Sequence, residues 1–145
     1  MRAGGVSAGC LFVYGTLMQA GGHPMARRLA SQSTVIGPGT IAGRLYNLGR
    51  YPGAVLGEAA SGCVHGIALR LHHPERTLSW LDAYEGASES DPEPRAYARV
   101  VIEVQLKGGR QIDAWVYDYR GPLAFARRLA SGRYFMPKPL ERLRS

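Results

Sequence analysis

The chain has 145 residues, of which 46% are hydrophobic and 9% aromatic, as is typical of a single soluble globular domain. Its formal net charge is +7, and the basic residues are dispersed without interleaved aromatic residues, which excludes an obvious nucleic-acid-binding surface. No apolar run approaches the roughly 20 residues that cross a bilayer, and residues 1–9 lack the apolar core of a signal peptide. We therefore expect a cytoplasmic protein with no membrane partner.

The chain carries no motif of a metal-dependent or nucleophilic enzyme. Cys10 and Cys63 both fall in apolar, strand-like runs, and two cysteines make neither a disulfide framework nor a zinc site. Because cysteine is commonly buried as a small hydrophobic residue, we expect two buried free thiols. The four histidines lack metal-ligand spacing, and no Ser/His/Asp arrangement, G-x-S-x-G motif or Walker sequence is present. We predict no metal and no cofactor.

The first part of the chain predicts short strands and one helix. Residues 11–14 form an apolar run typical of a short buried strand. A helix is expected over residues 24–30, since the segment opens with proline. Residues 35–48 are rich in Val, Ile and Gly and predict strands interrupted by turns at residues 37–39 and near Gly43.

Two further segments complete the first half. Residues 51–53, Tyr-Pro-Gly, are typical of a turn and precede the short apolar run 54–56. Residues 64–71 predict a strand with Gly66 inside it. A glycine in the interior of a strand often marks a bulge or the close approach of another backbone.

The clearest helix is predicted over residues 74–84. Pro74 and Glu75 suit its first turn and Gly86 suits its end. The segment 86–96 that follows is polar and acidic and contains two prolines. We expect a long loop there, with the function of a lid, because loops of this length are uncommon in compact domains.

The second half predicts a β-hairpin. Apolar and polar side chains alternate over residues 100–107 and again over 112–117, as in strands with one buried face. The pair Gly108-Gly109 supplies the turn between them. From Pro122 onward we expect a short helical stretch and a basic tail.

These elements predict an α+β fold built on a mostly antiparallel sheet or small β-barrel with two or three flanking helices. We expect a single domain over residues 1–145, with its core over about 10–120 and a basic C-terminal tail over 121–145.

The first candidate site is the turn Tyr14-Gly15-Thr16-Leu17, directly after the first strand. Gly15 has no Cβ, so a ligand can come close to the main chain there. Backbone N–H groups at such a turn can hold an anion without any charged side chain. The turn therefore predicts an anion-binding site.

Glu85 is the second candidate. It lies four residues after Leu81 and seven after Leu78, so the apolar stripe of the predicted helix ends in an acid on the inward face. Desolvation raises the pKa of a carboxyl group, and the negative end of the helix dipole acts in the same direction. Both effects raise the expected pKa of Glu85 toward the range that suits a general acid/base. A solvated Glu at a frayed helix end is the structural alternative.

Asp82 and Arg99 are rival charged residues. Asp82 lies one turn before Glu85, where it could brace the local backbone. Arg99 is expected to share a strand face with Tyr97. Its guanidinium could pair with Asp82, with Glu85 or with a carboxylate of a ligand, and a structural ion pair is favoured. We expect most tyrosines to be core residues with a satisfied hydroxyl, namely Tyr14, Tyr46, Tyr51, Tyr84, Tyr97 and Tyr117.

Several short motifs follow one another over residues 11 to about 119. They are Tyr14-Gly15-Thr16-Leu17, Gly43-Arg44-Leu45-Tyr46, Tyr51-Pro52-Gly53, Val64-His65-Gly66, Leu81-Asp82-Ala83-Tyr84-Glu85-Gly86, Tyr97-x-Arg99 and Trp115-Val116-Tyr117. In this order and spacing they resemble the gamma-glutamylcyclotransferase-like family, in particular its AIG2-like, gamma-glutamylamine cyclotransferase-like members.

The resemblance implies a small mixed barrel with flanking helices and an enzyme without a cofactor. In this family the substrate's own α-amine attacks the side-chain amide of a gamma-glutamyl group, which gives 5-oxoproline and a free amine. The resemblance implies that Glu85 is the catalytic acid/base. It also implies that the backbone of Tyr14-Gly15-Thr16-Leu17 binds the α-carboxylate, and we expect Tyr97 and Arg99 to bind substrate as well. The expected partner is a small gamma-glutamyl molecule, and the protein is expected to be a monomer or a homodimer.

One alternative function and one departure from the family pattern accompany this interpretation. The alternative is a non-catalytic binding module of the same fold, which would not need Glu85. The departure is Ser131-Gly132-Arg133-Tyr134, where the family usually has a Gly-Asp-Trp-like tract. We expect this tract and the loop 86–96 to set how the pocket closes and which leaving amine it accepts.

Overall fold

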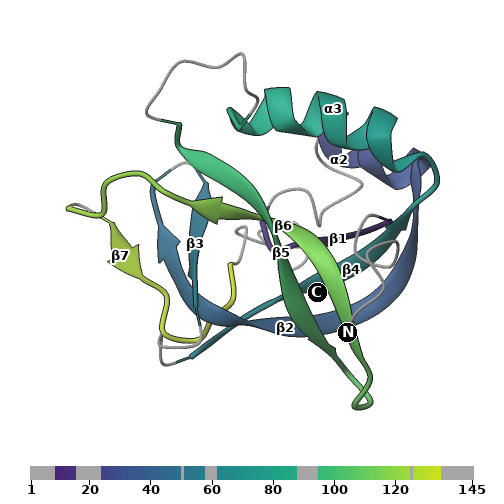
Figure 1. Cartoon of the computed structure of the whole chain (residues 1–145). Helices are drawn as coiled ribbons and strands as arrows, with labels where there is room; N and C mark the ends of the chain where they lie inside the picture. Colours follow the sequence, from purple (N-terminus) through teal and green to yellow (C-terminus); the bar gives the residue numbers. More distant parts are fainter. Residues whose placement is uncertain are drawn as a thin grey trace, which may run out of the picture.

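The computed structural model describes residues 9–15, 24–49, 51–57, 62–87, 95–124 and 126–134. Within these residues it contains a seven-stranded sheet and two helices, shown in Figure 1. In chain order the elements are β1 (Cys10–Val13), α2 (Pro24–Ser31), β2 (Ser33–Asn47), β3 (Pro52–Leu56), β4 (Cys63–Leu71), α3 (Pro74–Glu85), β5 (Tyr97–Leu106), β6 (Gln111–Tyr119) and β7 (Arg127–Arg128).

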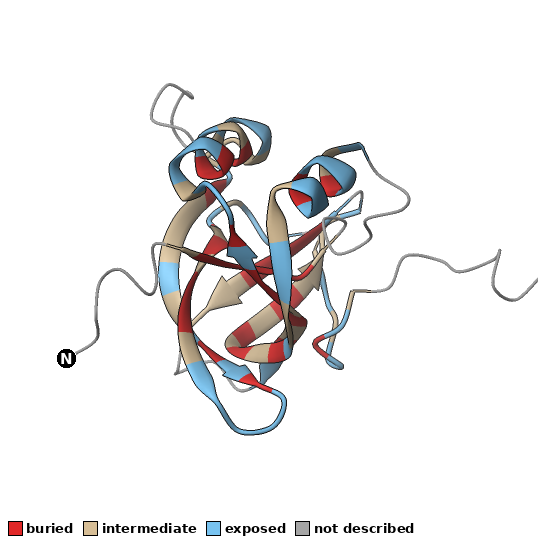
Figure 2. Cartoon of the chain, turned by 90° about the vertical axis from the view of Figure 1, so that its right-hand side faces the viewer, coloured by how far each residue is buried: buried red, intermediate tan, exposed pale blue. Residues whose placement is uncertain are grey.

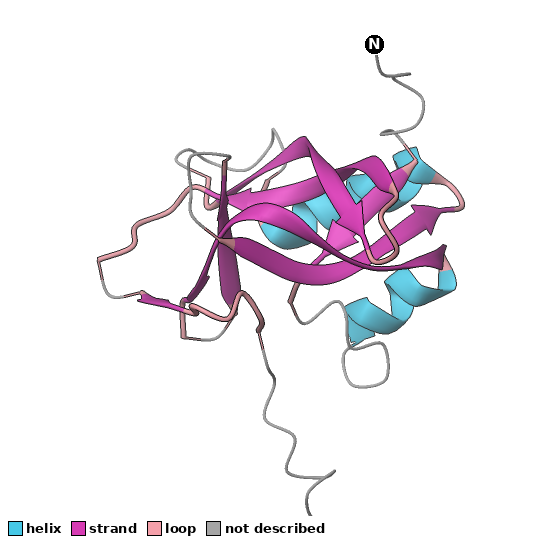
Figure 3. Cartoon of the chain, turned by 90° about the horizontal axis from the view of Figure 1, so that it is seen from below, coloured by secondary structure: helices cyan, strands magenta, loops and turns pink. Residues whose placement is uncertain are grey.

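Five of the strands close into a mixed barrel, and two lie outside it. The barrel order is β1-β4-β2-β3-β6, and β6 returns to β1. β6 runs parallel to both β1 and β3, whereas the other pairs are antiparallel. β5 forms a hairpin with β6 and also pairs with β2. Both helices lie on one side of the barrel in Figures 1 and 2, and Figure 3 shows the strands from the opposite side. The predicted fold class is thereby confirmed.

The core has two layers that meet at β1. The side chains of Phe12 and Tyr14 point into the barrel, where they pack with residues from the other five long strands. Leu11 and Val13 point the other way and pack against Leu29 of α2 and Leu81 of α3. Both faces of β1 are therefore buried, as its continuous apolar sequence predicts, and the helices bury the faces that look toward the barrel (Figure 2).

Helix α3 begins and ends where the sequence predicts. It carries Pro74 at its start, and Gly86 ends it in a left-handed conformation with φ of 73°. Gln32, just after α2, accepts hydrogen bonds from Thr77 Oγ1 at 2.7 Å and from Trp80 Nε1 at 2.9 Å. These contacts join the two helices at the first half of α3.

β2 is the largest departure from the sequence prediction. It is one strand of 15 residues, so the predicted turns at residues 37–39 and near Gly43 are wrong. The pairing with β4 shifts between Val35 and Gly37, which indicates a bulge. A Cβ at Gly39 would lie 2.7 Å from the carbonyl oxygen of Gln105. The glycines of β2 thus allow a shift in register and a close strand approach and do not form turns.

Two smaller predictions also need correction. Pro52 and Gly53 belong to β3 and pair with Asn47 and Tyr46, because proline is accepted as the first residue of a strand. Cys10 is buried as expected, but Cys63 is exposed because it lies on the face of β4 opposite to the buried Val64. Both thiols are free.

No helix follows β6 in the part that the structure describes, residues 120–124 and 126–134. β7 pairs instead with β2 at Tyr46 and Asn47. The pairing of β4 with β2 ends at Ala42, so this later part of β2 has an open edge, which β7 covers. No described helix is long and apolar enough to span a membrane.

Gly66 is predicted to be essential for the closure of the barrel. A Cβ at this position would overlap the carbonyl oxygen of Val13 and would lie 2.6 Å from the ring of Phe12. The carbonyl oxygen belongs to a paired strand and cannot move freely. We expect Gly66→Ala to lower the free energy of unfolding by about 3 kcal/mol in urea denaturation. Gly9→Ala is the matched control, because a Cβ there meets nothing within 4 Å; equal stability of the two variants would contradict the prediction.

Candidate active site

A cavity of about 310 Å³ opens at the end of the barrel that α3 covers. It lies where β1 ends, where β3 and β5 begin and where α3 stops. The lining residues are Phe12, Val13, Tyr14 and Gly15 after or in β1, Tyr51 and Pro52 at β3, Tyr84 and Glu85 of α3, Ala96 and Tyr97 at β5, and Tyr117 of β6.

Glu85 is the last residue of α3 and contributes its carboxyl group to this cavity. Burial raises its pKa from 4.5 to about 7. Among the described residues no hydrogen bond or ion pair opposes that shift, so desolvation acts alone. A carboxyl group with this pKa exchanges its proton readily near neutral pH, as a general acid/base must.

Three buried tyrosines surround the same space, and each donates its hydroxyl proton to the protein. Tyr14 Oη donates to the carbonyl oxygen of Tyr117 at 2.7 Å and accepts from the N–H of Ala54 at 3.2 Å. Tyr97 Oη donates to the carbonyl oxygen of Pro52 at 2.8 Å. Tyr117 Oη donates to Asp82 Oδ1 at 2.8 Å. The rings are therefore held in place before any ligand arrives.

Asp82 holds the last turn of α3 on the barrel. Its carboxylate accepts two hydrogen bonds from Arg99, from Nε at 2.7 Å and from Nη2 at 3.0 Å. The guanidinium of Arg99 also lies 4.3 Å from the centre of the Trp115 ring. Together with Tyr117, these contacts tie α3 to β5 and β6 one turn before Glu85.

The residues predicted as a site separate into three groups. Tyr14, Gly15, Glu85 and Tyr97 line the cavity together. Thr16 and Leu17 lie outside the described residues, so the predicted anion-binding turn is described only as far as Gly15.

Arg99 does not line the cavity but forms the favoured structural ion pair with Asp82. Asp82 accordingly braces two strands, whereas the sequence suggested the local backbone as its partner. Glu85 is not part of this ion pair.

Gly15 has a structural role in addition to the predicted one. A Cβ at this position would lie 2.7 Å from Cγ of Pro52. Glycine therefore lets the β3 proline pack against the end of β1, where both residues line the cavity. The side of Gly15 that was expected to admit a ligand is occupied by this ring.

Sequence reasoning missed most of the aromatic lining. Tyr14 and Tyr97 were predicted to bind substrate, and they and Tyr117 have satisfied hydroxyls as expected. The place of Tyr51, Tyr84 and Tyr117 in the lining was not predicted, and the expectation that Tyr51 and Tyr84 are core residues is wrong, because they are 45% and 42% exposed at the mouth of the cavity. A usable signal existed in β6, whose second face carries Trp115, Tyr117 and Tyr119. A face this aromatic needs a covering element, which is α3.

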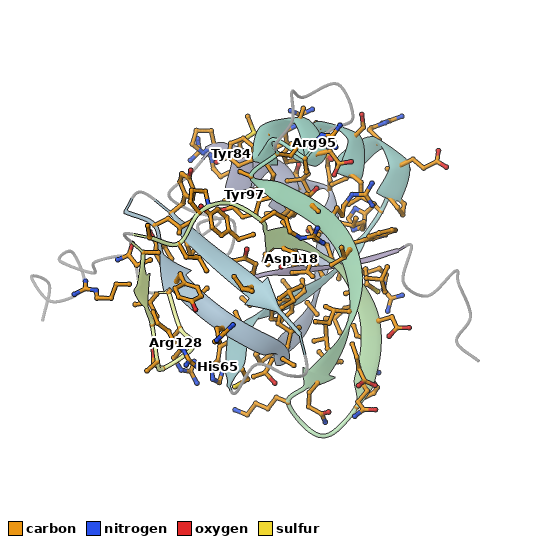
Figure 4. The ribbon with its side chains drawn as sticks, turned by 60° about the vertical axis from the view of Figure 1, so that its left-hand side comes forward. His65, Tyr84, Arg95, Tyr97, Asp118 and Arg128 are labelled. Carbon is orange, nitrogen blue, oxygen red and sulfur yellow. The ribbon has the colours of Figure 1, made fainter. Side chains whose placement is uncertain are left out.

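The two segments expected to close the pocket differ in position. Ser131-Gly132-Arg133-Tyr134 lies outside the cavity lining, and the Gly132 carbonyl accepts a 2.8 Å hydrogen bond from the N–H of His65. Figure 4 places His65 far from Tyr84 and Tyr97. This tract is therefore not part of the described lining, and its influence on how the pocket closes stays a prediction. Of the loop 86–96, Ala96 lines the cavity, and residues 88–94 lie outside the described part.

The described residues contain no group of three or more His, Cys, Asp or Glu side chains that could hold a metal ion. The chemistry available in the cavity is thus that of one carboxyl group, tyrosine hydroxyls and backbone groups.

Comparison with known proteins agrees with the resemblance seen in the motifs. The family model described as "Gamma-glutamyl cyclotransferase, AIG2-like" matches residues 11–136. The gamma-glutamylcyclotransferase family protein ytfP of Citrobacter rodentium is 33% identical over 127 residues, which cover 86% of this chain and 93% of the relative.

Solved structures share the fold. The solution structure of ytfP from Escherichia coli matches with a TM-score of 0.60 at 31% identity, over 87% of this chain and 96% of that one. The crystal structure of an AIG2-like protein from Mus musculus has a TM-score of 0.67 at 24% identity, over 92% of each chain, and shows likeness of fold alone. Family model and relative together identify the chain as a member of the gamma-glutamyl cyclotransferase, AIG2-like family.

Proposed function

We propose that this protein cyclises a gamma-glutamyl amine, releasing 5-oxoproline and a free amine, with Glu85 as the general acid/base. The observation that supports this most strongly is the partly buried carboxyl group of Glu85, whose pKa is raised to about 7, in a cavity that Gly15 also lines. Membership of the family supports the same reaction class.

In the proposed reaction the enzyme moves protons and supplies no nucleophile. Glu85 takes a proton from the substrate's α-ammonium, and the amine nitrogen then attacks the γ-carbonyl carbon to close a five-membered ring. As the C–N bond to the leaving amine breaks, Glu85 returns the proton to the leaving nitrogen. The ring nitrogen, which is positively charged after the attack, gives its second proton to the Glu85 carboxylate, which passes it to the released amine and is ionised again. The described lining agrees with this requirement, since it contains no Ser, Cys or Lys.

The geometry supports a division of tasks within the cavity. The buried floor around Tyr14, Tyr97 and Tyr117 suits the folded glutamyl part, which must be held in its attack conformation. Tyr51 and Tyr84 are 45% and 42% exposed and form the rim through which the leaving amine would extend. The backbone N–H groups from Gly15 onward are proposed to hold the α-carboxylate.

Replacement of Glu85 tests the mechanism. We expect Glu85→Gln to reduce the rate of 5-oxoproline formation from a panel of gamma-glutamyl amines by at least about 100-fold, since general acid–base catalysis contributes about 10²–10⁴-fold. Glu75→Gln is the matched control, because Glu75 is an exposed acid in the first turn of the same helix.

Each outcome of that assay has a defined meaning. Full activity in Glu85→Gln would refute the assigned role of Glu85. A wild-type protein that binds gamma-glutamyl amines but forms no 5-oxoproline would favour the non-catalytic binding module.

The pH dependence of the rate provides a second test. Glu85 must be ionised in the free enzyme to accept the proton, and its pKa is raised to about 7. We therefore expect kcat/KM to rise about tenfold per pH unit below 7 and to level off above it. Initial rates measured between pH 5 and about pH 8.5 would show this; a midpoint near 4.5, the ordinary value for a carboxyl group, would contradict it.

The same pKa predicts a stability effect that does not depend on catalysis. The folded protein holds the Glu85 proton between pH 4.5 and about 7, whereas the unfolded chain releases it, so wild-type stability falls as the pH rises through this window. A glutamine side chain at the same position does not titrate. We expect Glu85→Gln to gain on the order of 2–3 kcal/mol over wild type between pH 4.5 and pH 8 in urea denaturation. A constant difference between the two proteins across these pH values would show that Glu85 is not desolvated.

A further inference from the structure

Tyr97 and Tyr117 share a hydrogen-bonding pattern that the proposed catalytic step does not use. Both line the cavity, and both are only 6% and 5% exposed. Each hydroxyl proton points at a protein acceptor, the carbonyl oxygen of Pro52 for Tyr97 and the carboxylate of Asp82 for Tyr117. Among the described residues no N–H or O–H donates to either hydroxyl oxygen. What these two groups offer to a ligand is therefore a lone pair.

We propose that the hydroxyl oxygens of Tyr97 and Tyr117 bind the α-ammonium group of the substrate as hydrogen-bond acceptors, with Glu85 as the third acceptor. This inference rests on the proposed function and names the part of the substrate that these tyrosines recognise. An ammonium group has three N–H donors and no acceptor, so three acceptor side chains that line one cavity match it in number and in polarity.

The hydrogen bond from Tyr117 to Asp82 strengthens that role. A hydroxyl that donates to a carboxylate becomes a better acceptor, because hydrogen bonds in a chain polarise one another. Arg99 donates hydrogen bonds to both oxygens of Asp82, so Asp82 and Arg99 act as positioning residues. Burial raises the pKa of both tyrosines far above the ordinary value of 10, so both hydroxyls remain neutral and protonated.

The hydroxyl protons of Tyr97 and Tyr117 already bind protein acceptors, so they also leave the lone pair of the attacking α-amine free. Once Glu85 has taken its proton, the α-amine has a lone pair that must attack the γ-carbonyl carbon. A freely rotating hydroxyl would donate to this lone pair and hinder the attack. Tyr97 and Tyr117 hold their protons toward Pro52 and Asp82, so they can orient the amine without blocking it.

Tyr14 provides an internal comparison in the same cavity. Its hydroxyl donates to the carbonyl oxygen of Tyr117 and accepts from the N–H of Ala54. Because both of these positions are filled by the protein, we assign Tyr14 to the framework of the site and not to the ammonium. Tyr14→Phe is therefore the matched control for Tyr97→Phe and Tyr117→Phe.

The test compares two ligands that differ only in the α-amine. They are gamma-glutamylmethylamide and its des-amino analogue, N-methylglutaramate. Binding is measured by calorimetry in the Glu85→Gln protein, which is expected not to consume the first ligand. Tyr97→Phe, Tyr117→Phe and Tyr14→Phe are then added singly, and circular dichroism checks that each variant is folded.

We expect Tyr97→Phe and Tyr117→Phe each to weaken binding of the amine ligand by about tenfold or more, because hydrogen bonds to charged groups are the strong ones. The des-amino ligand should lose less than about threefold. Any general disturbance of the cavity affects both ligands alike, as we expect for Tyr14→Phe. Two phenylalanine variants at separate strands keep the test valid if one of them does not fold.

The measurements distinguish a failure of this inference from a failure of the proposed function. Equal losses for both ligands in Tyr97→Phe and Tyr117→Phe, with a wild-type enzyme that forms 5-oxoproline, would overturn the inference and leave the proposed function standing. A Glu85→Gln protein that binds neither ligand, together with a wild-type protein that forms no 5-oxoproline, would overturn both.

Discussion

The site depends on the interaction of Asp82 with two strands of the sheet. Its carboxylate accepts two hydrogen bonds from Arg99 of β5 and one from Tyr117 of β6. Gln32, just after α2, accepts hydrogen bonds from Thr77 and Trp80 of α3, and the Asp82 cluster ties the last turn of α3 to the sheet. Glu85 follows Asp82 by three residues, so the hydrogen bonds of Asp82 also hold Glu85 close to β1 and β5. Glu85 itself makes none of these hydrogen bonds. The carboxyl group of Glu85, the proposed general acid/base, is therefore not used to position the helix.

A partly buried carboxyl group at the C-terminal end of a helix lowers the stability of the folded protein when it is ionised. Desolvation and the negative end of the helix dipole both oppose ionisation there. The structure nevertheless surrounds Glu85 with tyrosines whose protons are already committed, and no described group compensates its charge. Asp82, the neighbouring acid, has the opposite environment, because its carboxylate accepts hydrogen bonds from the guanidinium of Arg99 and the hydroxyl of Tyr117. Two carboxyl groups one helical turn apart therefore have different environments: Asp82 is paired with a guanidinium and a hydroxyl, whereas burial raises the pKa of Glu85 to about 7.

Elements whose signals are local could be predicted from the sequence. Helix α3 has a proline at its start and a glycine after its end, and the alternation over residues 100–106 gives β5 directly. Placing Glu85 in the cavity followed from its spacing to Leu78 and Leu81. The continuity of β2, the pairing of β7 and the position of Tyr117 depend on partners distant in sequence. Glycine in a strand and glycine in a turn look alike until the opposite strand is known.

The division between floor and rim explains why one fold could serve several leaving groups. The proposed contacts to the glutamyl part come from strands that also build the barrel, so a change at Tyr97, Tyr117 or Gly15 alters packing as well as binding. Tyr51 and Tyr84 are exposed and are less constrained by the core. Under the proposed function, substitutions there would change the accepted amine at little cost in stability. Recognition of the shared half of the proposed substrate would then be coupled to folding, whereas recognition of the variable half would not.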